Sequence, residues 1–281
     1  MNKSYSSIIR FGGLLIFILF FYLKGFSQSQ MIYKTVGKDS LFLELNLPDE
    51  QFKRPVPLLV FYFGGGWNTG TIEQFRPYAE HFTKRGLATA LVDYRVYKRD
   101  GTTPFASLRD AKSAIRFLRK NADSLGIDAN KIIASGGSAG GHLASATALI
   151  EGFNEFTDDL DISCKPNALV LFNPVFDNGP AGYGYDRIKE QYHQFSPLHN
   201  IKKGAPPTII LLGTKDHLVP VETARYFTMQ MERLGSRCEL HLYDGQKHGF
   251  FNYNRSLEYY QKTLEQADLF IQSLGWLEKQ G

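Results

Sequence analysis

The chain has 281 residues, of which 43% are hydrophobic, and its formal net charge is +4. This length and apolar content favour one large folded domain, since α/β domains commonly exceed 200 residues. The near-balanced charge, with no basic patch, argues against a nucleic-acid-binding protein.

The first residues have the features of an export signal. Lys3 and Arg10 precede a 13-residue apolar run, which Lys24 ends and small residues follow. A transmembrane helix needs about 20 apolar residues, so we expect a signal peptide over residues 1–27 that is cleaved near Ser27. The protein would then be exported to the periplasm or the medium, with no stable membrane anchor. The mature chain would carry a net charge near +1, because the leader holds three cations and no acid.

Eight segments read as strands. The first two form an expected antiparallel hairpin at the sheet edge, and leucines alternate along the second of them. The other six alternate with helical patterns, one of which begins at Thr103-Pro104. The segments are residues 31–36, 41–47, 57–63, 88–94, 131–135, 168–172, 208–213 and 239–243. This alternation predicts an α/β fold, a mostly parallel eight-stranded sheet with helices on both faces, in a single domain over residues 28–281.

Three glycines, Gly64, Gly65 and Gly66, follow the apolar strand 57–63. Consecutive glycines let backbone N–H groups point at a developing negative oxygen without obstruction by side chains. A flexible turn or a phosphate cradle is the alternative, but the Lys-Ser/Thr of a P-loop does not follow. We interpret the glycines as an oxyanion-binding turn in which Gly65 and Gly66 donate.

The run Gly136-Gly137-Ser138-Ala139-Gly140 fits G-x-S-x-G and lies where a strand gives way to an Ala-rich helix. Glycines on both sides of Ser138 allow the sharp turn of a nucleophile elbow, which holds the hydroxyl beside the helix N-terminus. The Ala139 N–H would be the third oxyanion donor. Because small residues also flank many serines in helix-packing turns, the interpretation needs support from other segments.

That support comes from Asp216, just past strand 208–213, and His248, in the loop after strand 239–243. The chain order Ser138, Asp216, His248 is that of α/β hydrolases and differs from chymotrypsin and subtilisin. His248 would remove the Ser138 proton, and Asp216 would hold the imidazole in the correct tautomer. We interpret Asp110, which precedes Ser138, as structural. The other histidines have structural or surface explanations: His81, His142, His193, His199, His217 and His241.

At these residues the chain resembles α/β hydrolases of the acetyl esterase and hormone-sensitive-lipase-like group. It is most similar to secreted bacterial carboxylesterases of the acetylxylan and feruloyl esterase type. Further segments that carry the likeness are Asp93-Tyr94-Arg95-Val96, residues 108–116, Gly126-Ile127-Asp128, Asn173-Pro174-Val175 and Ser196-Pro197-Leu198. Phe63 stands where the group usually has His, so this chain lacks a side chain that commonly steadies the glycine turn.

The resemblance implies a serine carboxylic ester hydrolase that acts through an acyl-enzyme on short acyl esters. Acetyl or feruloyl groups on plant polysaccharide are the implied substrates, as small-molecule or oligosaccharide esters. We expect no cofactor and no metal, since H-E-x-x-H and Cys-pair spacings are missing. A prolyl-oligopeptidase-like serine peptidase and a non-catalytic binding protein on a hydrolase scaffold stay open as alternatives.

Residues 177–200 form a long connection between two predicted strands and are rich in Gly and Tyr. Such connections often act as lids or binding loops, so we expect a lid-like segment. Trp67, Tyr183 and Tyr185 would then bind substrate by presenting flat faces to a sugar or a phenolic acyl group. The alternative is that these rings pack the segment onto the body of the domain.

The chain has two cysteines, Cys164 and Cys238. An exported protein can form a disulfide, but two cysteines do not establish a framework. Cys164 precedes one predicted strand and Cys238 begins another that lies two strands further on, so we expect free thiols. The sequence gives no indication of the oligomeric state.

Overall fold

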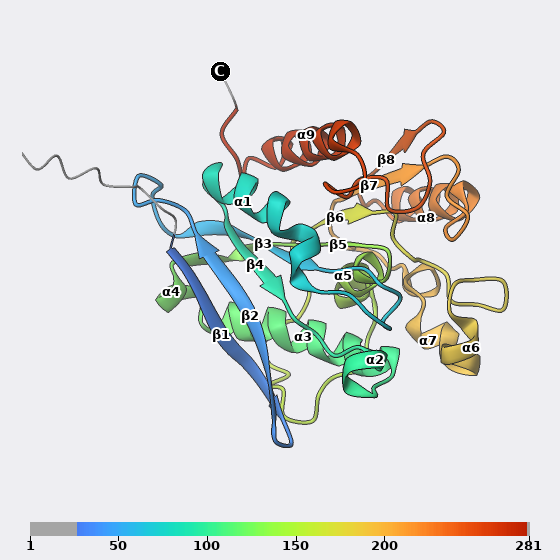
Figure 1. The fold of residues 1–281 in the computed structure, drawn as a ribbon, viewed down its shortest axis with the longest axis horizontal. Helices are drawn as coiled ribbons and strands as arrows, with labels where there is room; N and C mark the ends of the chain where they lie inside the picture. The colour runs from blue at the N-terminus through green and yellow to red at the C-terminus, as the bar shows by residue number, and fades with distance from the viewer. Residues whose placement is uncertain (1–26, 280–281) are drawn as a thin grey trace, which may run out of the picture.

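The computed structural model describes residues 27–279 (Figure 1). The signal peptide predicted over residues 1–27 therefore lies outside the described residues, apart from Ser27, where the first strand begins. Within the described part of the chain, no helix is long and apolar enough to cross a membrane.

The described residues form one eight-stranded sheet in the order β1-β2-β4-β3-β5-β6-β7-β8. Its strands are β1 (Ser27–Val36), β2 (Asp39–Leu47), β3 (Val56–Tyr62), β4 (Ala88–Val92), β5 (Ile127–Gly137), β6 (Ala168–Phe172), β7 (Thr208–Gly213) and β8 (Cys238–Tyr243). β1 pairs antiparallel with β2, and β2 antiparallel with β4, whereas the pairs from β4 through β8 are all parallel. The predicted mostly parallel sheet with an antiparallel edge hairpin is confirmed.

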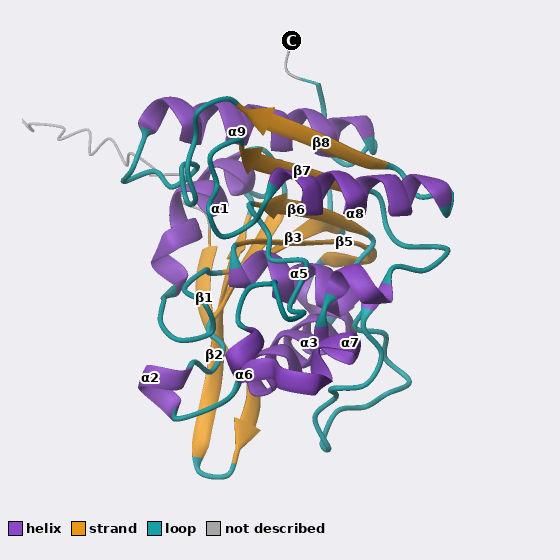
Figure 2. Ribbon diagram, turned by 90° about the vertical axis from the view of Figure 1, so that its right-hand side faces the viewer, coloured by secondary structure: helices purple, strands orange, loops and turns teal. Residues whose placement is uncertain are grey.

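Helices cover both faces of this sheet, as Figures 1 and 2 show. They are α1 (Arg76–Lys84), α2 (Tyr97–Asp100), α3 (Pro104–Lys120), α4 (Ala122–Leu125), α5 (Ala139–Leu149), α6 (Tyr185–Ile188), α7 (Tyr192–Phe195), α8 (Val221–Arg233) and α9 (Leu257–Ser273). α3, α5 and α8 pack on one face, and α1 and α9 pack on the other. A sheet covered in this way buries both sides of its central strands, which explains their almost continuous apolar sequences.

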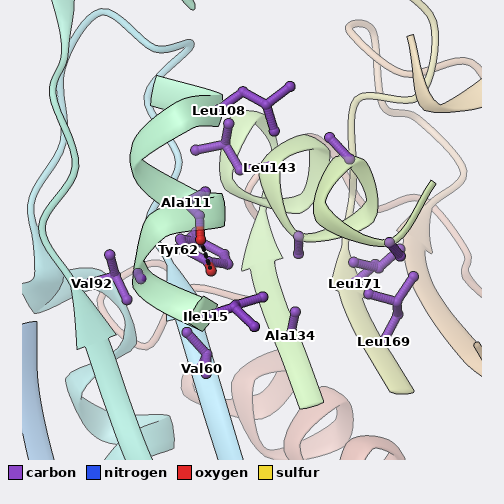
Figure 3. Packing of buried hydrophobic residues seen from close by; sticks show 14 of the residues in the cluster. Val60, Tyr62, Val92, Leu108, Ala111, Ile115, Ala134, Leu143, Leu169 and Leu171 are labelled. Atoms are coloured by element: carbon purple, nitrogen blue, oxygen red, sulfur yellow. Dashed lines mark hydrogen bonds between the residues drawn. The ribbon is translucent and has the colours of Figure 1, made fainter. Parts of the chain in front are cut away.

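The central strand β3 shows how the two cores divide. Val60 and Tyr62 face the core under α3 and α5, and Phe61 faces the core under α1 and α9. Figure 3 shows Leu108, Ala111 and Ile115 of α3 over β3, with the Tyr62 hydroxyl donating to the Ala111 carbonyl at 2.9 Å. β3 is therefore fixed from both sides up to its last residue.

The connection over residues 177–200 contains four short helical turns: α6, η2 (Lys189–Gln191), α7 and η3 (Pro197–Asn200). The sequence showed no clear secondary structure there, because each turn has only three or four residues and is too short to display helical periodicity. The segment is attached to the body of the domain through the buried residues Asn178, Ile188 and Phe195.

Asp110 of α3 lies at the centre of a buried charge cluster. Its carboxylate accepts from Lys34 Nζ at 2.6 Å, from Arg95 Nη2 at 2.7 Å and from Arg95 Nε at 2.8 Å. Lys34 also lies 2.7 Å from Glu155. The cluster joins β1, the turn after β4 and α3, which agrees with the structural interpretation of Asp110.

We predict that Asp110→Asn destabilises the fold, because it leaves Lys34 and Arg95 next to a neutral group in a buried site. The expected loss in the free energy of unfolding is about 3 kcal/mol, measured by chemical denaturation. Asp161→Asn, at an exposed loop carboxylate, is the matched control and should change stability little. Equal stability of the two variants would contradict a central role for the cluster.

Candidate active site

Ser138 lies at the carboxyl edge of the sheet, between the end of β5 and the start of α5. Its backbone has φ 55° and ψ −119°, a conformation that non-glycine residues rarely adopt. A Cβ added at Gly140 would lie 2.0 Å from the carbonyl oxygen of Tyr62, and one at Gly136 would lie 2.6 Å from the same atom. Only glycine fits at these two positions, so the elbow can press directly against β3.

The structure brings Ser138, His248 and Asp216 together at this edge. His248 Nε2 lies 2.8 Å from Ser138 Oγ, and His248 Nδ1 lies 2.7 Å from Asp216 Oδ2. The other carboxylate oxygen of Asp216 accepts from the backbone N–H groups of Leu218 at 2.9 Å and Val219 at 3.0 Å. Since a carboxylate only accepts, His248 donates from Nδ1, which leaves the lone pair of Nε2 facing the Ser138 hydroxyl.

The loop that carries His248, here the histidine loop (residues 244–256), is held by groups that the sequence analysis did not single out. The Gly249 N–H donates to Asn173 Oδ1 at 2.8 Å, and Arg255 Nη1 donates to the His248 carbonyl at 2.9 Å. Asn173 was noted only within the segment Asn173-Pro174-Val175, because nothing in that pattern indicates which loop its amide contacts.

The glycine turn (residues 64–66) lies beside the elbow. A Cβ added at Gly64 would lie 3.4 Å from the Cβ of Ser138. The Gly64 N–H donates to Gln74 Oε1, whereas the N–H groups of Gly65 and Gly66 have no acceptor among the described residues. Ala139 begins α5, so its N–H is one of the unpaired donors at a helix N-terminus. The three predicted donors are therefore open to an incoming acceptor.

The turn is also held from the connection over residues 177–200. Arg187 Nη1 donates to the Gly66 carbonyl at 2.5 Å, and its guanidinium lies 5.3 Å from the centre of the Trp67 ring. Tyr183 packs closely on the turn, since a Cβ at Gly66 would lie 2.5 Å from the Tyr183 hydroxyl. Nothing in the sequence indicated this role for Arg187, because its contact joins two distant segments of the chain.

Ser138 and His248 open into a cleft with a volume of about 630 Å³. Most of its lining side chains are polar, and the purely apolar ones are Pro77, Leu218 and Phe251. The polar side chains are those of Thr69, Thr71, Glu73, Gln74, Asn173, Tyr183, Asn252, Tyr253, Asn254 and Arg255. A hollow of similar size beside Arg119 lies where the strands begin, at the opposite edge of the sheet.

The three aromatic residues that were expected to bind substrate lie in different environments. Tyr183 lines the cleft, and its contact with substrate stays a prediction. Trp67 does not: it is only 1% exposed and packs against Tyr183, His142 and Phe195, which corrects the expectation of a free face. Tyr185 also lies outside the cleft lining, and its hydroxyl donates to Glu190 at 2.9 Å. Trp67 instead fits the alternative, in which aromatic rings pack the segment onto the body.

No group of three or more His, Cys, Asp or Glu side chains within residues 27–279 is arranged to hold a metal ion. Cys164 and Cys238 are both free thiols, and burial raises the pKa of Cys238 to about 12. Cys238 is therefore a poor nucleophile at neutral pH.

Comparison with known proteins identifies the family of this fold. A family model described as BD-FAE matches residues 43–178, and the dienelactone hydrolase family model matches residues 180–278. Thermogutta terrifontis esterase 2 has a solved structure with a TM-score of 0.86 and 42% identity, covering 90% of this chain and 97% of that one.

More distant relatives are also esterases. Esterase LipC of Mycobacterium tuberculosis is 28% identical over 70% of this chain and 54% of its own length. The acetylxylan esterase of Xylanibacter ruminicola is 26% identical over 75% of this chain and 44% of its own length. This chain spans about half the length of the curated relatives it matches.

We predict that His142 makes folding sensitive to acid. This residue of α5 is fully buried, its Nε2 donates to the Phe195 carbonyl at 2.9 Å, and burial lowers its pKa to about 3. An unfolded histidine has a pKa near 6.5, so the stability present above that pH is lost as pH falls toward 3. The part lost by pH 5 is about 2 kcal/mol.

His142→Gln should remove this part of the pH dependence. Denaturant unfolding at pH 7 and pH 5 would measure it, with His193→Gln, at an exposed position, as the control. The same loss of stability between the two pH values in wild type and in His142→Gln would show that His142 is not responsible.

Proposed function

The chain belongs to the α/β-hydrolase superfamily, and we propose that it is a serine carboxylic ester hydrolase that acts through an acyl-enzyme. The observation that supports this most strongly is the continuous hydrogen-bond chain from Asp216 through His248 to Ser138. Ser138, at the end of this series of hydrogen bonds, faces the cleft beside the N–H groups of Gly65, Gly66 and Ala139. In this arrangement Ser138 is the nucleophile, His248 the general base and acid, and Asp216 the residue that orients the imidazole.

In the proposed reaction, each step is assigned to a group of the site. Ser138 Oγ attacks the ester carbonyl carbon while its proton moves to His248 Nε2. The carbonyl oxygen becomes an oxyanion and accepts from the N–H groups of Gly65, Gly66 and Ala139. Collapse of this intermediate breaks the bond to the alcohol oxygen, which leaves with the proton from His248. Water then attacks the acyl-Ser138 ester by the same sequence and releases the acid.

A short acyl group on a polar alcohol fits the cleft best. Its lining offers many hydroxyl and amide groups, and few of the lining side chains are purely apolar ones that could receive a long acyl chain. Thermogutta terrifontis esterase 2 has been solved with propionate and with butyrate bound, and one relative is an acetylxylan esterase. Acetyl or feruloyl groups on plant polysaccharide, met after export, are the substrates that we propose.

The first test is the release of acetate and ferulate from xylan-derived oligosaccharides. Wild type should release at least one of them, and should hydrolyse p-nitrophenyl acetate, while Ser138→Ala should do neither. A peptide amide assayed in parallel separates an esterase from a peptidase, and fluorophosphonate labelling of Ser138 separates an enzyme from a binding protein. Equal rates for wild type and Ser138→Ala on every ester would refute the proposal.

A second prediction concerns Asp216. Asp216→Asn keeps the shape of the side chain but favours the wrong histidine tautomer, so kcat should fall by about 10⁴. Asp244→Asn is the matched control, since Asp244 is an exposed carboxylate in the histidine loop. It contacts Thr214, which begins the loop that carries Asp216. Similar kcat values for the two variants on p-nitrophenyl acetate would remove Asp216 from the mechanism.

A further inference from the structure

Two side-chain amides connect the glycine turn to the histidine loop across the cleft. Gln74, in η1 (Ile72–Phe75), accepts from the Gly64 N–H through Oε1 at 2.5 Å. Its Nε2 donates to Asn252 Oδ1 at 2.8 Å, and Asn252 Nδ2 donates to the Gly249 carbonyl at 2.7 Å. The three bonds form one unbroken path between two segments that carry different parts of the proposed machinery.

The ends of this path fix the orientation of both amides. The Gly64 N–H can only donate, so it requires the oxygen of Gln74, and the Gly249 carbonyl can only accept, so it requires the nitrogen of Asn252. The remaining nitrogen and oxygen then meet as donor and acceptor. A carboxylate at position 74 would place acceptors against each other at one link of the path, although its shape is the same.

The path acts on peptide groups next to the reacting ones. Gly64 precedes the proposed donor Gly65, and Gly249 follows His248. The Gly249 N–H is held separately by Asn173, so the path through Asn252 holds the carbonyl side of the same residue. Together with the bond from Arg255 to the His248 carbonyl, these contacts fix the backbone beside His248 at several points. Among the hydrogen bonds of the described residues, only the Gln74–Asn252 path ties it to the glycine turn.

We propose that Gln74 and Asn252 are a pair of positioning residues that set the distance between the oxyanion donors and the His248 imidazole. This inference rests on the proposed esterase function. Formation of the tetrahedral intermediate needs both groups at once, whereas substrate binding in the cleft does not. Loss of the pair should therefore lower kcat with little change in KM, because a displacement of about 1 Å can cost about 10²-fold in rate.

The test is a double-mutant cycle on p-nitrophenyl acetate hydrolysis with Gln74→Leu and Asn252→Ala. Each single variant should lower kcat about 10- to 100-fold and leave KM within about threefold. The kcat of the double variant should be no lower than that of the less active single variant, because either change alone breaks the path. Gln74→Glu, which keeps the shape, should behave like Gln74→Leu and covers the case in which the leucine variant folds poorly.

Gln261→Leu and Asn130→Ala are the matched controls, since both side chains are exposed and lie on α9 and at the other edge of the sheet. They should leave kcat unchanged. Unchanged kcat in Gln74→Leu and Gln74→Glu would overturn the proposal. So would additive losses in the double variant, because they would mean that the two residues act independently.

Amide hydrogen exchange gives a readout that does not need activity. In Gln74→Leu, both the glycine turn and the histidine loop should exchange faster than in wild type, although residue 74 belongs to neither segment. Faster exchange confined to the glycine turn would overturn the proposed link. If wild type hydrolysed no ester, the proposed function would fail, while this measurement would still decide whether the two amides couple the segments.

Discussion

The close contact between the backbone of α5 and the end of β3 is the constraint on which the site depends. Gly140 lies so near the Tyr62 carbonyl that no side chain fits between them. This approach brings the strained Ser138 and the N–H of Ala139 to the point where β3 continues into the glycine turn. This backbone contact therefore sets the position of the nucleophile and of the Ala139 N–H relative to the start of the glycine turn.

The remaining chemistry reaches that point because parallel strands end at the same edge. β7 delivers Asp216 and β8 delivers His248, as expected for a site at the carboxyl ends of an open α/β sheet. The Asp216 side chain is fully shielded from solvent, and two backbone N–H groups hold one of its oxygens. A buried carboxylate held in this way can orient an imidazole without moving itself, which is what its proposed role requires.

Much of this arrangement could be predicted from the sequence, because it depends on local patterns. Apolar runs marked the strands, glycines marked the elbow and the turn, and chain order alone indicated which Asp and His follow the correct strands. Contacts such as that of Gln74 with Asn252 could not be predicted, since they join residues 178 positions apart and have no pattern of their own. Trp67 was misjudged for a similar reason: what covers it comes from α5 and from residues 177–200, and neither can be inferred from its neighbours in the chain.

The packing around Phe63 holds the glycine turn without a histidine at this position. The Phe63 ring stacks on Tyr94 with centres 4.1 Å apart, and the Tyr94 hydroxyl donates to the Phe63 carbonyl at 2.6 Å. Gln74 holds the N–H at one end of the turn, and Arg187 holds the carbonyl at the other. The turn is thus fixed by four side chains around it, three of them polar. Because its proposed donors are backbone groups, their position follows from these contacts and does not depend on an imidazole at residue 63.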